Sequence, residues 1–475
     1  MKRIVLVALC VSVLAGCARY PANAPIDAID PDAGYRVVNT AGDTDDSTDL
    51  VLILTFSGGG TRAAALSYGV LEALRDTVLE FDGRKRRLLD EIDIISSVSG
   101  GSVTAAYYGL HGEKIFDDFE PRFLRRNAQG ALTRRFLAPW NWPSLLSPFY
   151  GRGDATAEYF NDILFEDATF ADLLRPGAPA ILINATDISQ GTRFLFSQDT
   201  FDLLCSDISS FPIARAVAAS SAVPVLLSPI TLINYPKQRC GFEAGEWVDE
   251  VLDDVASGDR RAQEARRIRH YTGNNDDHYV HLVDGGLADN LGLRVTIERT
   301  AFAGGFVEMV NLNGLRKFRR IVHVVVNAQT NPGQDWAKRE RSPGFVESVI
   351  ATPGVTLSRY GFETIETFLS ERDRWMENLR EYRCTDPASG FGQADCADAK
   401  SYFVELSFDR HLDAAEKDYL RALPTSFKLD DEQVDRVRRA ARDLLAQSSS
   451  FQALLDDLVS MPARQPVIVL DPSLP

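Results

Sequence analysis

The sequence has few basic residues, few histidines and no long apolar run. Its 475 residues include 51 Lys and Arg against 67 Asp and Glu, giving a formal net charge of −16, and only six histidines. The deficit of basic residues argues against a nucleic-acid partner and against docking on anionic lipid by charge alone. No apolar run reaches the roughly 20 residues that span a bilayer. The hydrophobic content of 45% is that of an ordinary globular protein.

The six cysteines lack the spacing of a metal site. None stands in a C-x₂-C pair, so the sequence predicts no bound metal. Four of them lie beyond the N-terminal region and could pair in an oxidising compartment: Cys205, Cys240, Cys384 and Cys396. Four cysteines allow three connectivities, of which pairing between sequence neighbours is one, and the sequence alone does not choose.

The first 16 residues are typical of an export signal. Lys2 and Arg3 precede an almost entirely apolar stretch, Ile4–Leu14, which is too short to cross a membrane. The following residues, Leu-Ala-Gly-Cys17, resemble the lipobox of bacterial lipoproteins, in which the cysteine is lipidated and becomes the first residue of the mature protein. An ordinary secretory signal with a chance cysteine is the alternative.

The lipobox resemblance implies a protein anchored by lipid in the bacterial cell envelope and facing the periplasm. Acyl chains on Cys17 would supply the two or more anchors that stable attachment requires. Ala18, rather than Asp, follows the cysteine, which by the same resemblance favours the outer membrane over the inner. The rest of residues 17–48 is rich in Pro and Asp without an apolar period, so we expect a polar tether there.

Beyond the tether, short apolar runs alternate with helical patterns, which predicts a layered α/β fold. Strands are expected at 50–56, 92–95, 180–183, 280–283, 321–326 and 404–408. Asp430 and Gln433 have the spacing of a capping pair at the start of a helix. Because strand signals continue late in the chain, we expect a core over residues 49–330 and a C-terminal part, 331–475, packed on the same domain.

Three glycine-marked turns follow expected strands, and the first contains Gly58, Gly59 and Gly60. Consecutive glycines allow a sharp turn that points several N–H groups at one anion. The same turn fits the dinucleotide fingerprint G-x-G-x-x-A, with Glu80 near the place of a ribose-binding acid. A Walker loop is excluded, because no Gly-Lys-Ser/Thr follows.

The second turn spans residues 97–101 and the third begins at Asp284. A nucleophile elbow needs small residues two positions before and after its serine, and Ser97 and Gly101 meet this requirement for Ser99. Asp284 precedes two glycines at the end of an expected strand, a suitable place for a functional carboxylate in an open α/β sheet.

Together the three turns resemble the patatin-like phospholipases. That family carries a G-G-G-x-R oxyanion loop, matched by residues 58–62, and a G-x-S-x-G nucleophile, matched at Ser99 with Ser97 in place of the first glycine. It also carries a D-G-G/A base motif, matched at Asp284, and the motifs appear here in the family's order. The resemblance implies a three-layer α/β fold with a central, mostly parallel sheet flanked by helices and a helical C-terminal part.

The resemblance also implies a serine acyl hydrolase of phospholipase A or lysophospholipase type that needs no metal or organic cofactor. Asp284 would accept the hydroxyl proton of Ser99, which attacks an ester carbonyl. N–H groups of the glycine turn would hold the oxyanion, while Arg62 would steady the loop or face a lipid phosphate. The expected partner is a phospholipid or another lipid ester, and no protein partner can be inferred.

Two other classes of function stay open. A non-catalytic envelope lipoprotein could keep the fold as a scaffold, although the intact Ser99 and Asp284 weigh against it. A dinucleotide-binding oxidoreductase fits the first turn alone, and export beyond the soluble cofactor pool weighs against it. A separate segment, residues 134–150, combines Arg, Trp and aliphatic residues. It is expected either at a lipid interface or buried in the core.

Overall fold

The computed structural model describes residues 18–40, 49–81, 83–253, 259–273, 277–315, 317–330, 338, 340–342, 344–393 and 395–461. Cys17 and the signal-like residues 1–16 lie outside this part of the chain, so their expected processing and lipidation stay predictions. Within the described ranges, no helix combines the length and the apolar character needed to cross a bilayer.

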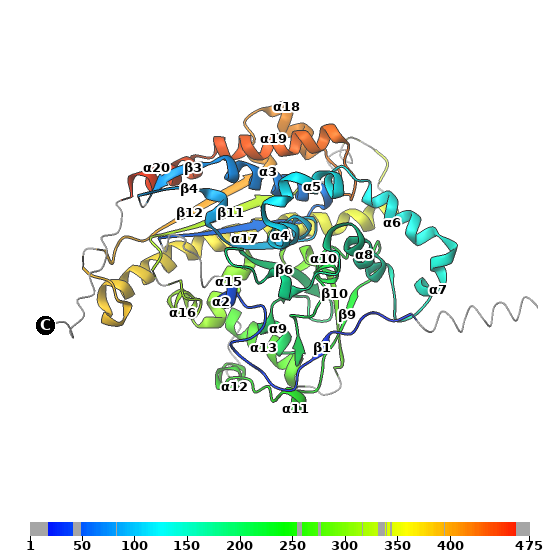
Figure 1. Ribbon diagram of the computed structural model, residues 1–475, viewed down its shortest axis with the longest axis horizontal. Helices are drawn as coiled ribbons and strands as arrows, with labels where there is room; N and C mark the ends of the chain where they lie inside the picture. Colours follow the sequence, from blue (N-terminus) through cyan, green and yellow to red (C-terminus); the bar gives the residue numbers. More distant parts are fainter. Residues whose placement is uncertain are drawn as a thin grey trace, which may run out of the picture.

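A central eight-stranded sheet organises the fold (Figure 1). Its order is β12-β11-β2-β5-β6-β10-β9, and β7 pairs with β6. The strands are β2 (Leu50–Phe56), β5 (Ile92–Val98), β6 (Ala180–Asp187), β7 (Thr192–Phe196), β9 (Ile230–Ile233), β10 (Tyr279–Asp284), β11 (Arg320–Asn327) and β12 (Lys400–Ser407). From β12 to β6 the neighbours are parallel, whereas β7, β9 and β10 pair antiparallel. The predicted, mostly parallel sheet is confirmed.

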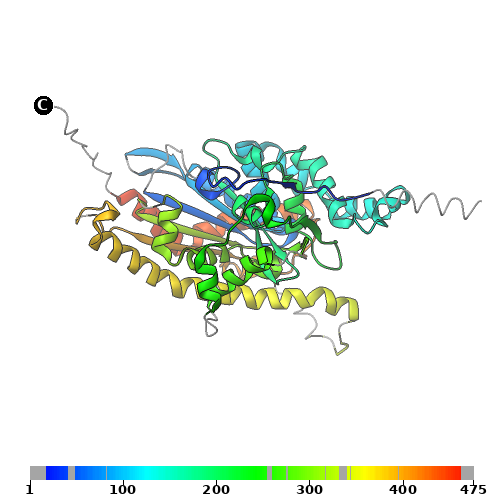
Figure 2. The same ribbon diagram turned by 90° about the horizontal axis from the view of Figure 1, so that it is seen from below.

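Alternate side chains of the central strands enter two separate cores, as the two-residue period of a strand requires. On β2, Leu52 and Leu54 face one core, and Val51 and Ile53 face the other. The first core is covered by α3 (Gly60–Asp76), α4 (Gly100–His111), α10 (Ile213–Ser220) and α19 (Asp431–Gln447). The second is covered by α15 (Arg294–Ala303), α16 (Phe306–Leu312) and α17 (Phe345–Thr385), and Figure 2 shows α17 running along that face. The three predicted layers are confirmed.

Shorter elements complete the chain. The remaining strands are β1 (Ala24–Pro25), β3 (Val78–Phe81), β4 (Arg84–Arg87) and β8 (Ser206–Asp207). The remaining α-helices are α2 (Val37–Thr40), α5 (Ile115–Phe119), α6 (Ala128–Leu137), α7 (Trp142–Leu145), α8 (Arg152–Phe160), α9 (Gln198–Asp202), α11 (Lys237–Cys240), α12 (Glu246–Asp253), α13 (Arg260–Gly273), α14 (Gly286–Asp289), α18 (Ala414–Arg421) and α20 (Ser449–Ser460).

Every strand expected from the sequence is present, but the functional strands are longer than their apolar runs. β5 continues past Ile95 through Ser96 and Ser97, because both serines pair with β2 and β6 and find buried acceptors. The expected capping pair of α19 is also confirmed: the Asp430 N–H donates to the Gln433 side chain at 2.9 Å.

The C-terminal part completes the same domain as the core. β12 extends the sheet beside β11 over its whole length. α19 packs on α3, where Arg438 forms an ion pair with the buried Glu72 at 2.7 Å. Residue 330 is therefore no boundary between structural units, because the sheet continues from one side of it to the other.

The N-terminal segment differs from the polar tether expected for residues 17–48. In its described part, β1 pairs with β8, and Tyr35 is 1% exposed. Arg36 forms ion pairs with Asp199 at 2.6 Å and Asp202 at 2.7 Å. The tether prediction is wrong for residues 18–40, because this segment is held by hydrogen bonds, ion pairs and single buried side chains, which leave no apolar period in the sequence.

Two disulfides join sequence neighbours. Cys205 pairs with Cys240 at a Cα–Cα distance of 5.5 Å, and Cys384 pairs with Cys396 at 4.9 Å. Of the three connectivities open to the sequence, the structure has this one.

Gly69, on α3, tests how closely α19 packs on that helix. A Cβ at Gly69 would lie 2.8 Å from both the Ala441 Cβ and the Arg438 carbonyl oxygen. Gly69→Ala should therefore push α19 away and lower the free energy of unfolding, measured in urea, by about 1–3 kcal/mol.

The matched control is Gly361→Ala on α17, where a Cβ would meet the flexible end of Gln329 at 3.3 Å and Leu291 at 3.7 Å. This change should leave stability within about 1 kcal/mol of wild type or raise it, since alanine is the better helix former. Equal losses in both variants would contradict the described contact of α19.

Candidate active site

Ser99 stands on a strained turn between β5 and α4. Its φ of 50° and ψ of −122° lie where residues other than glycine are rare, and the residue is 5% exposed. Such a conformation costs about 1–3 kcal/mol and persists only where its surroundings enforce it. The following glycines permit the close approach: a Cβ at Gly100 would lie 2.0 Å from the Gly60 carbonyl oxygen. The elbow and the first glycine turn thus fit against each other.

The partners of β6 bring Ser99 and Asp284 together. β7 occupies one edge of β6 along residues 183–187, so β5 and β10 must share the other edge. On that edge β5 ends with Val98 opposite Asn184, and β10 ends with Asp284 opposite Ala185. The last residue of β10 therefore lies next to the residue that follows β5. There the Ser99 hydroxyl lies close enough to the Asp284 carboxyl to lower its pKa.

The carboxylate of Asp284 is buried, and this sets its acidity. Burial raises its pKa to about 6, although hydrogen bonds from the Gly286 N–H, at 2.8 Å, and from Ser99 act in the opposite direction. The side chain is thus ionised at neutral pH and still able to take a proton, as a general base must.

None of the six histidines has a hydrogen bond or an ion pair with either residue in the described structure. His281, three residues before Asp284, points its Nδ1 at the Thr231 hydroxyl, 3.0 Å away. His323 is buried against Phe368, and burial lowers its pKa to about 3. The titratable side chain found next to Ser99 is therefore an aspartate.

Ser220 holds the backbone of the turn at Ser99 in place, and it was not among the residues predicted from the sequence. Its hydroxyl accepts the Ser99 N–H at 2.8 Å and donates to the Asn184 carbonyl oxygen at 2.6 Å. Thr186 holds the other partner, donating to the Asp284 carbonyl oxygen at 2.9 Å. Both are small buried residues; Thr186 belongs to a segment, residues 184–187, that resembles the family, whereas no local pattern distinguishes Ser220.

The first glycine turn, predicted to bind an oxyanion, differs at Gly58 from the sequence prediction. The Gly58 N–H donates to the Asn290 carbonyl oxygen at 3.0 Å and is not available to a substrate. Among the described residues, the N–H groups of Gly59 and Gly60 have no acceptor. Gly58 is instead required by space, because a Cβ there would lie 3.3 Å from the Ser99 Cβ and 2.6 Å from the Asn290 Oδ1.

Arg62 is buried and holds this loop in place through hydrogen bonds. The residue is 2% exposed, and burial lowers its pKa to about 10. Its guanidinium donates to the carbonyl oxygens of Ala328 at 2.9 Å and Leu423 at 2.7 Å, and to the Thr425 hydroxyl at 3.0 Å. Arg62 therefore steadies the loop, as one alternative proposed, and does not reach a lipid phosphate or the oxyanion.

The same neighbourhood weighs against a bound dinucleotide. At the start of α3, the Thr61 N–H donates to the Ser426 carbonyl oxygen at 2.9 Å. A Cβ at Gly60 would lie 2.3 Å from that same oxygen. Protein backbone thus covers the helix end where a pyrophosphate would bind in a dinucleotide enzyme.

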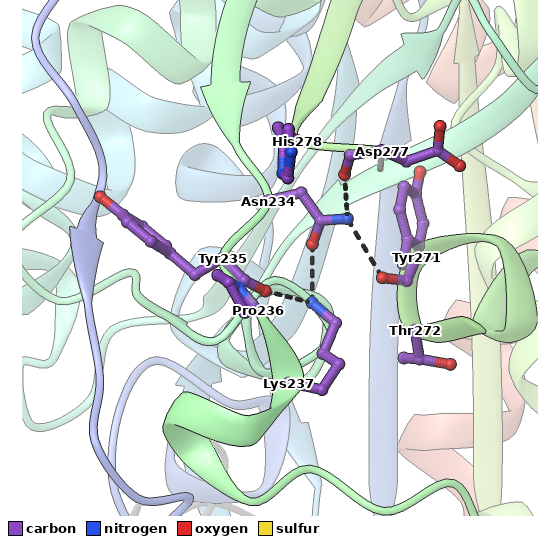
Figure 3. A pocket seen from close by; sticks show the side chains of 8 residues that line it. All are labelled: Asn234, Tyr235, Pro236, Lys237, Tyr271, Thr272, Asp277 and His278. Atoms are coloured by element: carbon purple, nitrogen blue, oxygen red, sulfur yellow. Dashed lines mark hydrogen bonds between the residues drawn. The ribbon is translucent and has the colours of Figure 1, made fainter. Parts of the chain in front are cut away.

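A small pocket next to β9 and β10 contains none of the predicted site residues (Figure 3). Lys237 donates to the Asn234 side chain at 2.6 Å and to the Tyr235 carbonyl oxygen at 2.9 Å. Asn234 in turn donates to the carbonyl oxygens of Tyr271 and Asp277. These bonds fasten the start of β10, and the described residues hold no cluster of side chains suited to a metal ion.

Comparisons with known proteins identify the family of this chain. A search of curated proteins finds no match. Among solved structures, human GIVD cytosolic phospholipase A2 is similar at a TM-score of 0.44 and 14% identity, and its complex with methyl γ-linolenyl fluorophosphonate at 0.40 and 13%. These matches cover 89% of this chain but 62% of the solved chains. The sequence profile of the family described as patatin-like phospholipase matches residues 54–297. Since this match covers more than half of the chain and includes all three glycine turns, the protein belongs to the patatin-like phospholipase family.

Proposed function

We propose that the protein is a serine acyl hydrolase that cleaves fatty-acyl esters of phospholipids or lysophospholipids. The observation that carries this proposal is the buried Asp284 carboxylate beside the Ser99 hydroxyl, next to two backbone N–H groups that have no acceptor among the described residues. Membership of the patatin-like phospholipase family supports a lipid ester as the substrate.

The reaction proceeds through an acyl-enzyme. Asp284 takes the hydroxyl proton while the Ser99 oxygen attacks the ester carbonyl, and the N–H groups of Gly59 and Gly60 hold the negative oxygen. When the carbon–oxygen bond to the alcohol breaks, Asp284 returns the proton to the leaving oxygen. Water, deprotonated by Asp284, then attacks the Ser99 ester, the fatty acid is released, and Asp284 returns the proton to the Ser99 oxygen.

We further propose that lipid on Cys17 anchors the protein in the bacterial envelope, facing the periplasm, with the outer membrane favoured. The lipobox-like sequence supports the anchor. The two disulfides fit an oxidising compartment.

Replacing the nucleophile should abolish hydrolysis without unfolding the protein. Ser99→Ala is expected to lower the turnover of both a soluble short-chain ester and a phospholipid panel by at least about 10³-fold. Product mass spectrometry on the panel measures the loss and identifies the acyl position that the wild type cleaves.

Ser67→Ala is the matched control, because Ser67 is a buried serine on α3 whose hydroxyl has no partner in the described structure. It should keep wild-type turnover. Undiminished turnover in Ser99→Ala would rule out the proposed nucleophile.

The pH profile should report the base. Only ionised Asp284 can take the Ser99 proton, so kcat/KM should rise about tenfold per pH unit up to pH about 6 and then level off. Asp284→Asn should remove the activity and the titration together. A limb centred near pH 4, or near 7 as for histidine, would contradict the assignment.

The Asp284→Asn variant should lose activity but gain stability against unfolding. Because the pKa of Asp284 is raised from 3.8 to about 6 by folding, its stabilising contribution is complete at low pH and is lost as pH rises through that window. Asp284→Asn, which cannot ionise, should therefore gain up to about 3 kcal/mol over wild type at pH 8, and less at pH 4. A large loss of stability would show that its inactivity reflects misfolding.

The anchor is tested by the N-terminus of the mature protein. In protein purified from bacterial membranes, mass spectrometry should find an acylated Cys17 as the first residue. Cys17→Ser should abolish the acylation. A mature chain that starts elsewhere without acyl groups would contradict the lipoprotein proposal.

A further inference from the structure

The segment from residue 137 to 149, here called the apolar arm, exposes large apolar side chains at one end of the molecule. Trp140 is 80% exposed and Trp142 is 51% exposed. Its other exposed apolar residues are Leu137, Leu146 and Phe149. Both ribbon views show α6 and α7 reaching away from the sheet (Figures 1 and 2). The alternative that this segment is buried in the core is thus contradicted, and a large exposed apolar patch marks an interaction site.

The charged residues in the stretch of sequence that contains the apolar arm are all basic. Residues 121–153 contain six arginines and no Asp or Glu, in a chain with a net charge of −16. Three of these arginines are exposed and form no ion pair in the described structure: Arg126, Arg134 and Arg152. The other three pair with acids of neighbouring elements: Arg122 with Glu166, Arg125 with Glu120 and Asp435, and Arg135 with Glu158 and Asp162. Tryptophan within a cationic rim is the combination that favours the interface of an anionic bilayer.

The start of the described chain is fixed to the same arm. The Ser147 hydroxyl donates to the Ala18 carbonyl oxygen at 2.7 Å, and the Tyr20 N–H donates to the Phe149 carbonyl oxygen at 2.9 Å. The Arg19 guanidinium lies over the Phe149 ring, 4.9 Å from its centre. Ala18 directly follows Cys17 in the sequence, so the proposed anchor joins the folded protein at the apolar arm.

The arm also connects to the active site. Arg152 donates to the Val225 carbonyl oxygen at 2.9 Å, and Val225 and Leu226 are 66% and 52% exposed. Val225 has a φ of 73°, a conformation that is rare for a β-branched residue. A few residues earlier, the Ala222 carbonyl oxygen accepts the Asp284 N–H at 3.0 Å. Two exposed apolar side chains, Val225 and Leu226, thus lie between the contact with Arg152 and the backbone that holds Asp284.

We propose that the apolar arm, together with Val225 and Leu226, seats on the surface of a lipid bilayer and orients the active site toward it. This inference deepens the proposed function and rests on it for the lipid substrate. The anchor keeps the protein at the membrane, whereas the arm decides which face of the protein meets the lipid. An ester bond could then reach Ser99 without the whole lipid leaving the bilayer.

Tryptophan fluorescence in brominated vesicles tests the proposal on the full-length lipidated protein. Trp140 and Trp142 are two of five tryptophans, and brominated phosphatidylcholine–phosphatidylglycerol should quench their emission. Trp140→Ala/Trp142→Ala should lose most of the quenching while remaining bound through Cys17. Its turnover of vesicle phospholipid should fall about tenfold, with turnover of a soluble short-chain ester unchanged, whereas Ser99→Ala loses both activities.

Leu312→Ala/Phe362→Ala is the matched control, with side chains 65% and 57% exposed on α16 and α17. It should keep both the quenching and the vesicle turnover. Equal quenching in wild type and the Trp140/Trp142 variant would overturn the proposal, and so would an equal loss of soluble-ester turnover. The proposal would also be overturned if vesicles do not quench the wild-type protein and the wild type forms a dimer that the Trp140/Trp142 variant does not form. That result would show that the arm binds a second copy of the chain instead.

Discussion

The site depends on a single change of neighbour along one edge of β6. Up to Asn184 that edge pairs with β5 in parallel, and from Ala185 onward it pairs with β10 antiparallel. Only this exchange places the end of β10 beside the elbow that follows β5. As a consequence Ser99 and Asp284 lie side by side, and Ser220 and Thr186 hold the two strand ends in position.

The last third of the chain is equally necessary to the oxyanion loop. Arg62 reaches carbonyl oxygens that follow β11 and α18, and the Ser426 carbonyl oxygen covers the start of α3. A buried guanidinium without these acceptors would carry a large desolvation cost. Residues after 297, beyond the family match, thus contact the loop and hold it in place although they are far from it in the sequence. They do not form a separate module.

Sequence predicted what is local and missed what is distant. The strands, the capping pair of α19 and the three glycine turns each leave a pattern within a few residues, and the structure contains all of them. The use of the Gly58 N–H by Asn290, and the partners of Arg62, depend on contacts across hundreds of residues. The net charge is likewise a total, and it includes one acid-free stretch with six arginines. A net charge does not show how the charged residues are distributed over the surface of the folded protein.

The central claim is that Ser99, activated by Asp284, carries the acyl group. Acid quenching of the wild-type enzyme during turnover of a phospholipid, followed by peptide mass spectrometry, tests it most directly. The account predicts a fatty-acyl ester on the peptide that contains Ser99, present during turnover and absent once the lipid is consumed. An acyl group on another residue, or steady turnover through an enzyme that never carries one, would contradict it.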